Sequence, residues 1–440
     1  MTSGRTLLAL LALAALPALT LSAQVGSPAG PVPVADLTAR RADLLTRMKN
    51  GVAIIPSSHE RDLDEYPQDS DYRENDDFFY LTGLEAPNSY LVLVARDTAE
   101  AQVYLYLPAR DTAQERWTGP LLGPGPEATA ITGIAEVRPA DLAHKQIRGF
   151  VRSSTVRGGT LYLLLGEQAA ADTFFTQLAL GTGAGVTDLR PSLAAMRLVK
   201  DSDEVRRLRT AAEISVKGHL AAMRAAHPGA WEYELEGVAE GTFRSLGAER
   251  LAYPSIVGTG INATTLHYDK GRGQLQAGDL VVMDMAAEYG YYAADVTRTI
   301  PASGHFTKRQ LDIYNLVLGT QQAAMDSVHP GITMGRLSQI SREYMKNNSG
   351  DLCAPGTCDR YFIHGLGHWI GMDVHDVGNY ATPLAPNMTF TIEPGIYIPE
   401  EKLGVRIEDD ILVTPTGYEN LSKGAPRQAA DVEKAMKSKN

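Results

Sequence analysis

The sequence predicts an α/β (α+β) protein in which an N-terminal α/β domain is followed by a second, mixed domain. The chain has 440 residues, whereas one domain usually takes about 150. Short apolar runs alternate with amphipathic helical segments in the first part, and the pattern changes near residue 200. Apolar residues make up 44% and charged residues 21% of the chain, a composition typical of globular proteins.

Residues 1–23 resemble an export signal. Arg5 precedes an apolar run from Leu7 to Leu21, and small residues allow cleavage near Ala23. We therefore expect a periplasmic or secreted protein. Leu21 is bulky for a cleavage site, so an uncleaved membrane anchor is the alternative, and only that alternative predicts contact with a membrane.

The first domain is expected over residues 35–195 and the second over residues 203–425. In the first, runs rich in β-branched and aromatic residues predict strands at 52–56, 90–95 and 102–108, with helices at 36–48 and 141–151. In the second, Ser202-Asp203-Glu204 is a helix-opening sequence. Later helices are predicted at 308–328 and 334–346, among strands separated by Gly and Pro.

Charge and cysteine usage exclude two classes of site. There are 41 basic and 52 acidic residues without a dense basic block, so nucleic acid is not an expected partner. Cys353 and Cys358 flank a turn sequence, which favours a disulfide in an oxidising compartment over two free thiols. A zinc site is not expected there because a second pair of ligands is missing.

Residues 280–299 predict a β-hairpin that carries two aspartates. If Tyr289-Gly290 forms the turn, Asp284 and Asp295 stand directly opposite each other, with their Cβ atoms about 5 Å apart. Two facing carboxylates among apolar neighbours need a cation between them. The alternative is a partly solvated acidic pair held by Arg298 or a lysine.

Three histidines lie close together at His364, His368 and His375. The spacing of the first two resembles a zincin helix, but the required glutamate is absent and Gly365 and Gly367 disfavour a helix. A single histidine is more often a packed core residue. Three of the ten histidines in so short a stretch indicate a site instead.

Two later strands add carboxylates. Glu393 ends a strand at a Pro-Gly stop, and Glu408 shares a face with Arg406 in the segment 404–410. Alone, each glutamate is more often solvated. Together, five side chains form an oxygen-rich set that suits two Mn²⁺ ions, or Zn²⁺ or Co²⁺, with a hydroxide bridging the metals; they are Asp284, Asp295, His368, Glu393 and Glu408.

Several motifs in order resemble the Xaa-Pro aminopeptidases, also called aminopeptidase P, of the pita-bread metallopeptidases. They are Leu266-His267-Tyr268, the two-aspartate hairpin, the histidine segment, Ile392-Glu393-Pro394-Gly395 and Arg406-Ile407-Glu408-Asp409-Asp410. The resemblance implies a C-terminal pita-bread domain and metal-dependent hydrolysis of the N-terminal Xaa-Pro bond. The expected substrate is a peptide with proline in second position.

The resemblance also implies individual roles. Asp284 would bind one metal, His368 and Glu393 the other, and Asp295 and Glu408 both. Glu393 would move the proton, while His375 and His267 would stabilise the tetrahedral intermediate at the scissile carbonyl. His364 would line the pocket near the proline ring, and Arg406 would be a cation on the substrate side.

The first domain distinguishes close relatives. The N-terminal domain of aminopeptidase P is resembled by two segments, Glu65 to Arg73 and Asn75 to Gly83. Methionine aminopeptidases lack this domain. Creatinase shares the overall shape but lacks the metal-binding carboxylates that are present here. Trp117 is similar to an aromatic residue that family members lend to a neighbouring subunit's pocket, so a homo-oligomer is expected; a plain exposed loop tryptophan is the alternative. A prolidase-type dipeptidase and a catalytically silent binding protein are the alternative functions.

Overall fold

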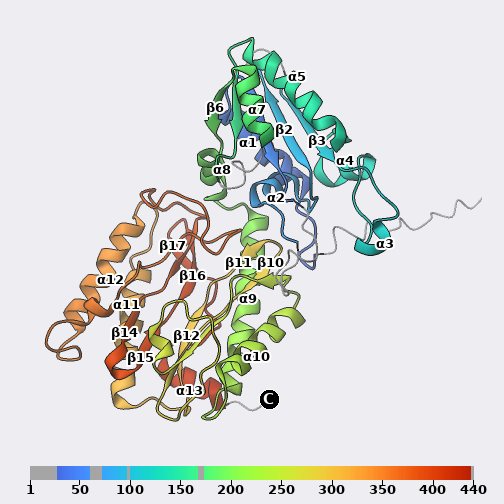
Figure 1. The fold of residues 1–440 in the computed structure, drawn as a ribbon. Helices are drawn as coiled ribbons and strands as arrows, with labels where there is room; N and C mark the ends of the chain where they lie inside the picture. The colour runs from blue at the N-terminus through green and yellow to red at the C-terminus, as the bar shows by residue number, and fades with distance from the viewer. Residues whose placement is uncertain (1–26, 60–71, 97–99, 167–172, 438–440) are drawn as a thin grey trace, which may run out of the picture.

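A computed structural model describes residues 27–59, 72–96, 100–166 and 173–437. Figure 1 shows two lobes, an upper one formed by the first half of the chain and a lower one formed by the second. The predicted signal at 1–23 and the motif residues Glu65 to Asp71 lie outside the described residues. Among those that are described, no helix is long and apolar enough to cross a membrane. The domain limits 35–195 and 203–425 stay predictions.

The upper lobe is built on one six-stranded mixed sheet in the order β4-β3-β2-β1-β5-β6. The three strands predicted from sequence are confirmed within a residue at their ends. Strands β1 and β2, and β2 and β3, are antiparallel, while β5 runs parallel to β1. The strands are β1 (Gly51–Pro56), β2 (Tyr90–Ala95), β3 (Gln102–Leu107), β4 (Glu136–Pro139), β5 (Thr160–Leu163) and β6 (Gly185–Asp188).

Helices cover both faces of this sheet because its strands alternate between two apolar faces. Ala53 and Ile55 of β1 join one core cluster, whereas Val52 and Ile54 join the other. The first cluster takes in α1 (Val34–Arg47), α2 (Asp76–Thr82), α4 (Pro126–Thr132) and α8 (Arg190–Arg197). The second takes in α5 (Ala143–Thr155) and α7 (Thr173–Thr182). The short α3 (Glu115–Thr118) stands apart from the sheet in Figure 1.

In the lower lobe, long helices pack beside several small sheets (Figure 1). Helix α9 begins after Asp201, whose side chain forms a capping box with Glu204, so the cap is one residue before the predicted opening at Ser202. The helices are α9 (Ser202–Ala225), α10 (Glu232–Ser245), α11 (Lys308–Met325), α12 (Met334–Asn348) and α13 (Ala429–Lys437). The predicted helix at 308–328 thus ends at Met325.

The small sheets of the lower lobe have the orders β12-β9-β8, β11-β10-β7, β13-β16-β17 and β14-β15. The first two contain β7 (Arg250–Leu251), β8 (Ile256–Thr259), β9 (Leu280–Asp284), β10 (Ala287–Tyr289), β11 (Tyr292–Ala293) and β12 (Thr297–Pro301). The others contain β13 (Thr389–Ile392), β14 (Gly395–Ile398), β15 (Leu403–Arg406), β16 (Asp409–Thr414) and β17 (Gly417–Asn420).

The register predicted for the aspartate hairpin is wrong. The turn is Gly290-Tyr291 rather than Tyr289-Gly290, and Asp284 therefore pairs with Thr297 instead of Asp295. Both turn residues have a positive φ, 58° at Gly290 and 72° at Tyr291, as the turns of tight hairpins require. A tyrosine is uncommon in that conformation. Contacts from the upper lobe hold it there, because the Tyr291 ring stacks on Phe79 with centroids 3.8 Å apart.

Ion pairs join the lobes. Arg197, at the end of α8, lies 2.6 Å from Asp376 in the lower lobe and 2.9 Å from Asp77 in the upper lobe. Arg73 pairs with Glu288 at 3.0 Å. Because Arg197 and Asp376 are both buried, the lobes meet through charges that water does not screen.

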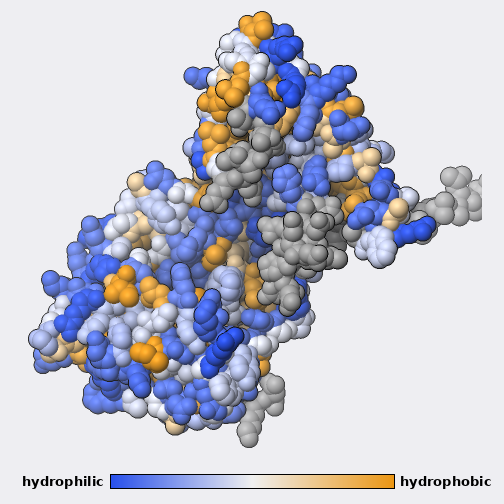
Figure 2. Space-filling model, viewed as in Figure 1, coloured by the Kyte–Doolittle hydropathy of each residue, from blue (hydrophilic) through white to orange (hydrophobic). Residues whose placement is uncertain are grey.

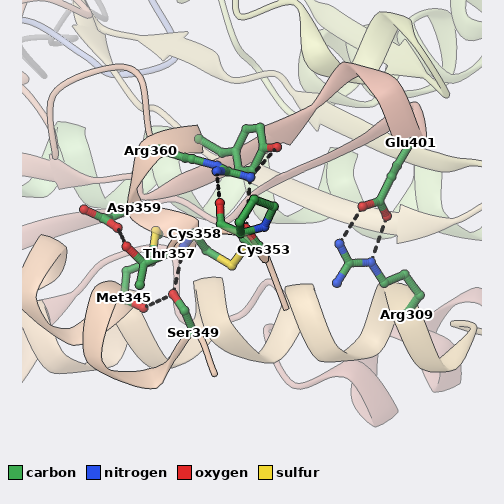
Figure 3. The surroundings of a disulfide bond; sticks show 11 residues. Arg309, Met345, Ser349, Cys353, Thr357, Cys358, Asp359, Arg360 and Glu401 are labelled. Carbon is green, nitrogen blue, oxygen red and sulfur yellow. Dashed lines mark hydrogen bonds and ion pairs between the residues drawn. A yellow bond between two sulfur atoms is a disulfide. The ribbon is translucent and has the colours of Figure 1, made fainter. Parts of the chain in front are cut away.

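The predicted disulfide between Cys353 and Cys358 is present, in the loop between α12 and the short helix η4 (Cys358–Tyr361). Figure 3 shows Arg360 over this loop, with Nη2 donating to the Cys353 carbonyl at 2.9 Å, while Ser349 of the same region accepts from the Cys358 backbone N–H at 2.8 Å. On the face drawn in Figure 2, apolar residues are scattered among hydrophilic ones.

Candidate active site

A cavity of about 520 Å³ lies in the lower lobe. Tyr253, Leu266 and Val374 line part of it. Nine of the ten residues predicted from sequence also line it, namely Asp284, Asp295, His368, Glu393, Glu408, His375, His267, His364 and Arg406. Side chains separated by up to 155 positions in the chain, from Tyr253 to Glu408, thus meet at one cavity.

The two aspartates meet through a shared partner. Asp284 ends β9 and Asp295 lies just before β12. Since Asp284 pairs with Thr297, Asp295 is its diagonal neighbour on the same face. The hydroxyl of Tyr253 lies 2.6 Å from Oδ1 of Asp284 and 2.7 Å from Oδ1 of Asp295. One hydroxyl has a single hydrogen, so it donates to one carboxylate at a time.

His368 and Glu393 are brought together by pairing between the histidine segment and the end of β13. The backbone N–H of Thr391 donates to the His368 carbonyl at 2.9 Å, and that of Glu393 to the Leu366 carbonyl at 2.8 Å. A Cβ at Gly367 would lie 1.9 Å from the Thr391 carbonyl oxygen. A glycine is therefore required at this close approach, and the predicted absence of a helix is confirmed.

The imidazole of His368 faces the carboxylates. Its Nε2 lies 3.3 Å from Oδ2 of Asp295 and 3.7 Å from Oε1 of Glu393. Nδ1 lies 3.1 Å from the Trp369 carbonyl, and a hydrogen bond there leaves Nε2 as the nitrogen that can bind a metal. Burial alone would lower the pKa of His368, but the hydrogen bond and charge of Asp295 raise it to about 9.

The strand predicted over 404–410 is interrupted. Strand β15 ends at Arg406 and β16 begins at Asp409, so Ile407 and Glu408 connect two different sheets. Arg406 and Glu408 nevertheless both reach the cavity. Nη2 of Arg406 lies 2.7 Å from Oδ2 of Asp284, and the Thr297 hydroxyl donates to Oε2 of Glu408 at 2.6 Å.

The chemistry of these side chains fits divalent cations. Four carboxylates face one arginine and one histidine, which leaves an excess of negative charge in a buried place. Glu408 is 1% exposed, and its Oε1 has no hydrogen-bond partner within the described chain. Ligand atoms of Asp295, His368 and Glu408 all lie within 4.8 Å of one another. Oxygen ligands with one imidazole are typical of sites for Mn²⁺ or Zn²⁺.

The crowding of carboxylates also appears in their proton affinities. Burial and then the charge of Asp295 raise the pKa of Glu408 well above its usual range. Burial and Asp295 likewise raise the pKa of Glu393 to about 8, although His368 opposes this shift. Without a cation, the cluster would therefore hold protons, and a metal ion that replaces them relieves the repulsion.

Three further histidines form the walls. Nε2 of His364 lies 2.8 Å from the Tyr397 hydroxyl, which accepts from Nη1 of Arg406 at 3.0 Å. His375 and His267 are exposed at the cavity, and the His375 ring centre is 4.1 Å from that of His368.

Trp117 does not line the cavity. It belongs to α3 and is 87% exposed. Its assignment to a neighbouring subunit's pocket stays a prediction.

Sequence reasoning missed two tyrosines of the site. Tyr253 lies in an irregular loop, where no periodicity marks it. Tyr397 could have been found, because a hairpin of β14 and β15 places Gly395 opposite Arg406. Tyr397 then lies two residues along, on the same face as Arg406.

Comparisons with known proteins agree with this geometry. Residues 206–415 match the model of metallopeptidase family M24, and residues 37–157 match that of the aminopeptidase P N-terminal domain. Xaa-Pro aminopeptidase of Escherichia coli is 35% identical, over 90% of this chain and 96% of its own length. The Haemophilus influenzae enzyme of the same name is 32% identical, over 92% and 98%.

Solved structures show the same two-domain architecture. Escherichia coli aminopeptidase P with the inhibitor Pro-Leu superposes with a TM-score of 0.84 at 32% identity, over 92% of this chain and 99% of that one. Pseudomonas aeruginosa aminopeptidase PepP gives 0.85 at 32% identity, over 92% and 98%. The expected N-terminal domain and C-terminal pita-bread domain are confirmed, and the chain is a hydrolase that belongs to the Xaa-Pro aminopeptidases of metallopeptidase family M24.

Proposed function

We propose that the protein hydrolyses the bond between an N-terminal residue and a following proline, at a site that holds two divalent metal ions. The observation that carries this proposal is the convergence of four carboxylates and one imidazole on a single cavity. The names of its relatives support the choice of substrate. Mn²⁺ is the preferred ion in this proposal, because oxygen ligands predominate.

Each ligand has a place in the proposed pair. Asp284 would bind one ion, His368 and Glu393 the other, and Asp295 and Glu408 would bridge both. Bound there, two divalent ions would supply Lewis acidity and would lower the pKa of water at the site. Two observations support these assignments. Oε1 of Glu408 has no hydrogen-bond partner among the described residues, and the contact of His368 Nδ1 with the Trp369 carbonyl leaves Nε2 available to a metal.

The remaining side chains handle protons and charge. Glu393 accepts the proton of the attacking water and passes it to the proline nitrogen as the peptide bond breaks. His375 and His267 stand at the open side of the cavity and stabilise the negative charge that develops on the carbonyl oxygen. His364 contacts the proline ring, and Arg406 orients Asp284 while facing the substrate.

Location and assembly remain proposals. We infer an exported protein from the sequence of residues 1–23, and the disulfide at Cys353 is consistent with an oxidising compartment. We also infer a homo-oligomer, in which Trp117, exposed on α3, reaches a neighbouring copy. Analytical ultracentrifugation of the intact protein and of Trp117→Ala tests this, and a monomeric wild type contradicts it.

The central experiment removes and restores metal. Treatment with a chelator should abolish hydrolysis of a Xaa-Pro-Xaa tripeptide, and Mn²⁺ should restore it. Full activity in metal-stripped protein, with metal absence verified by elemental analysis, would contradict the proposed mechanism.

A second experiment separates aminopeptidase from dipeptidase. The protein is assayed with Gly-Pro and with longer peptides that begin with Gly-Pro. We expect the longer peptides to be preferred. A preference for the dipeptide would assign the prolidase-type activity instead.

A further inference from the structure

The loop from the end of β8 to Gly273 carries one wall of the cavity. We call residues 259–273 the His267 loop. Its Leu266, His267 and Asp269 all line the cavity. Among the hydrogen bonds of the described residues, none involves the imidazole of His267. The position of this ring therefore depends on where the backbone of the loop places it.

A buried carboxylate outside the cavity holds both ends of this loop. Glu232, the first residue of α10, is 0% exposed. Its Oε1 accepts hydrogen bonds from the Thr259 backbone N–H at 2.7 Å and from Nδ2 of Asn262 at 2.9 Å. Its Oε2 accepts from the Gly273 backbone N–H at 2.5 Å. One side chain thus connects the first and last residues of the His267 loop.

The opposite side of the loop rests on the strand that carries Arg406. Nη2 of Arg406 donates to the Leu266 carbonyl at 3.3 Å. A Cβ at Gly404 would lie 1.9 Å from the Ala263 carbonyl oxygen, so the two backbones are in close contact. The loop is therefore held between α10 and β15. The carboxylate of Glu232 is the side chain that links its two ends, beside a backbone hydrogen bond from the Glu232 N–H to the Gly273 carbonyl at 2.9 Å.

Glu232 has no place in the metal site. It does not line the cavity, and its hydrogen bonds go to the loop rather than to the carboxylates that face the metals. A charged acceptor with three donors in a buried place is a strong and directional anchor. Displacement of a catalytic group by about 1 Å can cost on the order of 100-fold in rate.

We propose that Glu232 is a positioning residue for hydrolysis, which acts by fixing both ends of the His267 loop so that His267 faces the scissile carbonyl. This inference rests on the role of His267 under the proposed function. If Glu232 had a structural role alone, its replacement would lower stability, and its effect on kcat would not depend on whether His267 is present. Kinetics of single and double variants measure this difference.

The test is a double-mutant cycle with Glu232→Gln and His267→Ala, assayed on a Xaa-Pro-Xaa tripeptide in the metal-loaded protein. Gln keeps the size of the side chain. Its NH₂ group, however, would face a backbone N–H whose hydrogen bond the wild-type carboxylate accepts, so that hydrogen bond is lost. We expect each single variant to lose roughly 10- to 100-fold in kcat, with a smaller change in KM. The double variant should be no slower than His267→Ala alone, because no ring remains to be positioned.

The matched control is Glu234→Gln, the same substitution on the exposed side of α10. Glutamine still accepts the hydrogen bond from the Trp231 N–H that Glu234 receives at 3.4 Å, so wild-type kinetics are expected. Metal content and melting temperature are measured for every variant. If Glu232→Gln does not fold, Asn262→Ala replaces it in the cycle, since that residue donates to the same carboxylate.

The outcomes separate the two proposals. Wild-type kcat in Glu232→Gln, or losses that multiply in the double variant, would overturn the positioning role and leave the proposed function intact. Wild-type kcat in His267→Ala would overturn the role of His267 in the proposed function, and the inference with it. If the two losses of kcat do not multiply in the double variant and the metal content is unchanged, the result supports Glu232 as a positioning residue.

Discussion

The guanidinium group of Arg406 lies 2.7 Å from the carboxylate of Asp284, and both side chains are buried. Asp284 is also a proposed metal ligand, so two cations of different kinds would neutralise it. Removal of one partner of a buried ion pair typically costs about 3 to 5 kcal/mol, because the other charge stays behind without water. The contribution of Arg406 to neutralising Asp284 can therefore be measured as a change in the free energy of unfolding, without substrate.

Arg406→Gln should destabilise the metal-free protein by about 3 kcal/mol, and the metal-loaded protein by less, because bound metal still neutralises Asp284. Urea unfolding with chelator and with Mn²⁺ measures both values. Arg309→Gln is the control, since Arg309 pairs with Glu401 at the surface, with side chains 35% and 40% exposed, and should cost under about 1 kcal/mol. Equal losses of the Arg406 variant in both conditions would argue against metal at Asp284.

Asp295→Asn should lose the dinuclear occupancy of the site. Asp295 lies 3.3 Å from His368 and belongs to the group of atoms that can hold an ion. An amide is a neutral and weaker ligand than a carboxylate. Elemental analysis after dialysis measures the ions bound per chain, with Asp269→Asn at the exposed part of the cavity as the control. Two ions retained at wild-type affinity would show that Asp295 does not bridge.

His219 should make stability depend on pH. Burial, with a smaller contribution from Arg298, lowers its pKa from 6.5 to about 4, and the side chain is 0% exposed. The unfolded chain therefore binds more protons than the folded chain between pH 4 and 6.5, so this contribution to stability rises with pH in that window and is lost as pH falls. The loss at pH 4.5 should be on the order of 2 kcal/mol.

His219→Gln isolates that effect, because Gln can still donate to the Met285 carbonyl that His219 contacts at 2.9 Å. The free energy of unfolding of both proteins is measured from pH 7.5 to 4.5 in the presence of chelator. The wild type should lose more stability than the variant. Parallel curves would mean that the folded protein accommodates the charged imidazole.

Replacement of both Cys353 and Cys358 by Ser should destabilise the protein by about 2 kcal/mol, the loop-closure entropy expected for so short a loop. Activity should persist, because Arg360 and Ser349 still hold the loop by hydrogen bonds. Thermal unfolding and peptide hydrolysis measure the two effects. Reductant should lower the melting temperature of the wild type and leave the variant unchanged; a response of the variant would point to another cause.

Local patterns predicted the secondary structure well. Short runs rich in β-branched and aromatic residues located β1, β2 and β3, and the helix signals located α11 and α12, because these elements are specified by neighbouring residues. The strand break at Ile407 was missed. It joins two sheets, and the division of strands between sheets depends on packing that a short window does not contain.

The geometry of the site was harder to predict from the sequence than its residues were. Nine of the ten predicted residues line the cavity, whereas Tyr253 of its lining was missed, and the register predicted between Asp284 and Asp295 was wrong. The left-handed conformation of Tyr291 sets that register, and it is stabilised by Phe79 and by the Glu74 backbone N–H, which donates to the Tyr291 hydroxyl at 2.9 Å. These partners come from more than 200 positions away, and tertiary contacts of that kind override local turn preferences.

The ion pairs between the lobes have a consequence for folding. A fragment that starts at residue 203 would keep Asp376 but lose both Arg197 and Lys200, the two cations that lie within 3.1 Å of it. Glu288 would likewise lose Arg73. The excised second half would thus keep Asp376 without a counter-charge and Glu288 with Arg250 as its remaining partner, at 3.1 Å. Although the polypeptide divides visibly in two, its halves are expected to unfold as a single cooperative unit.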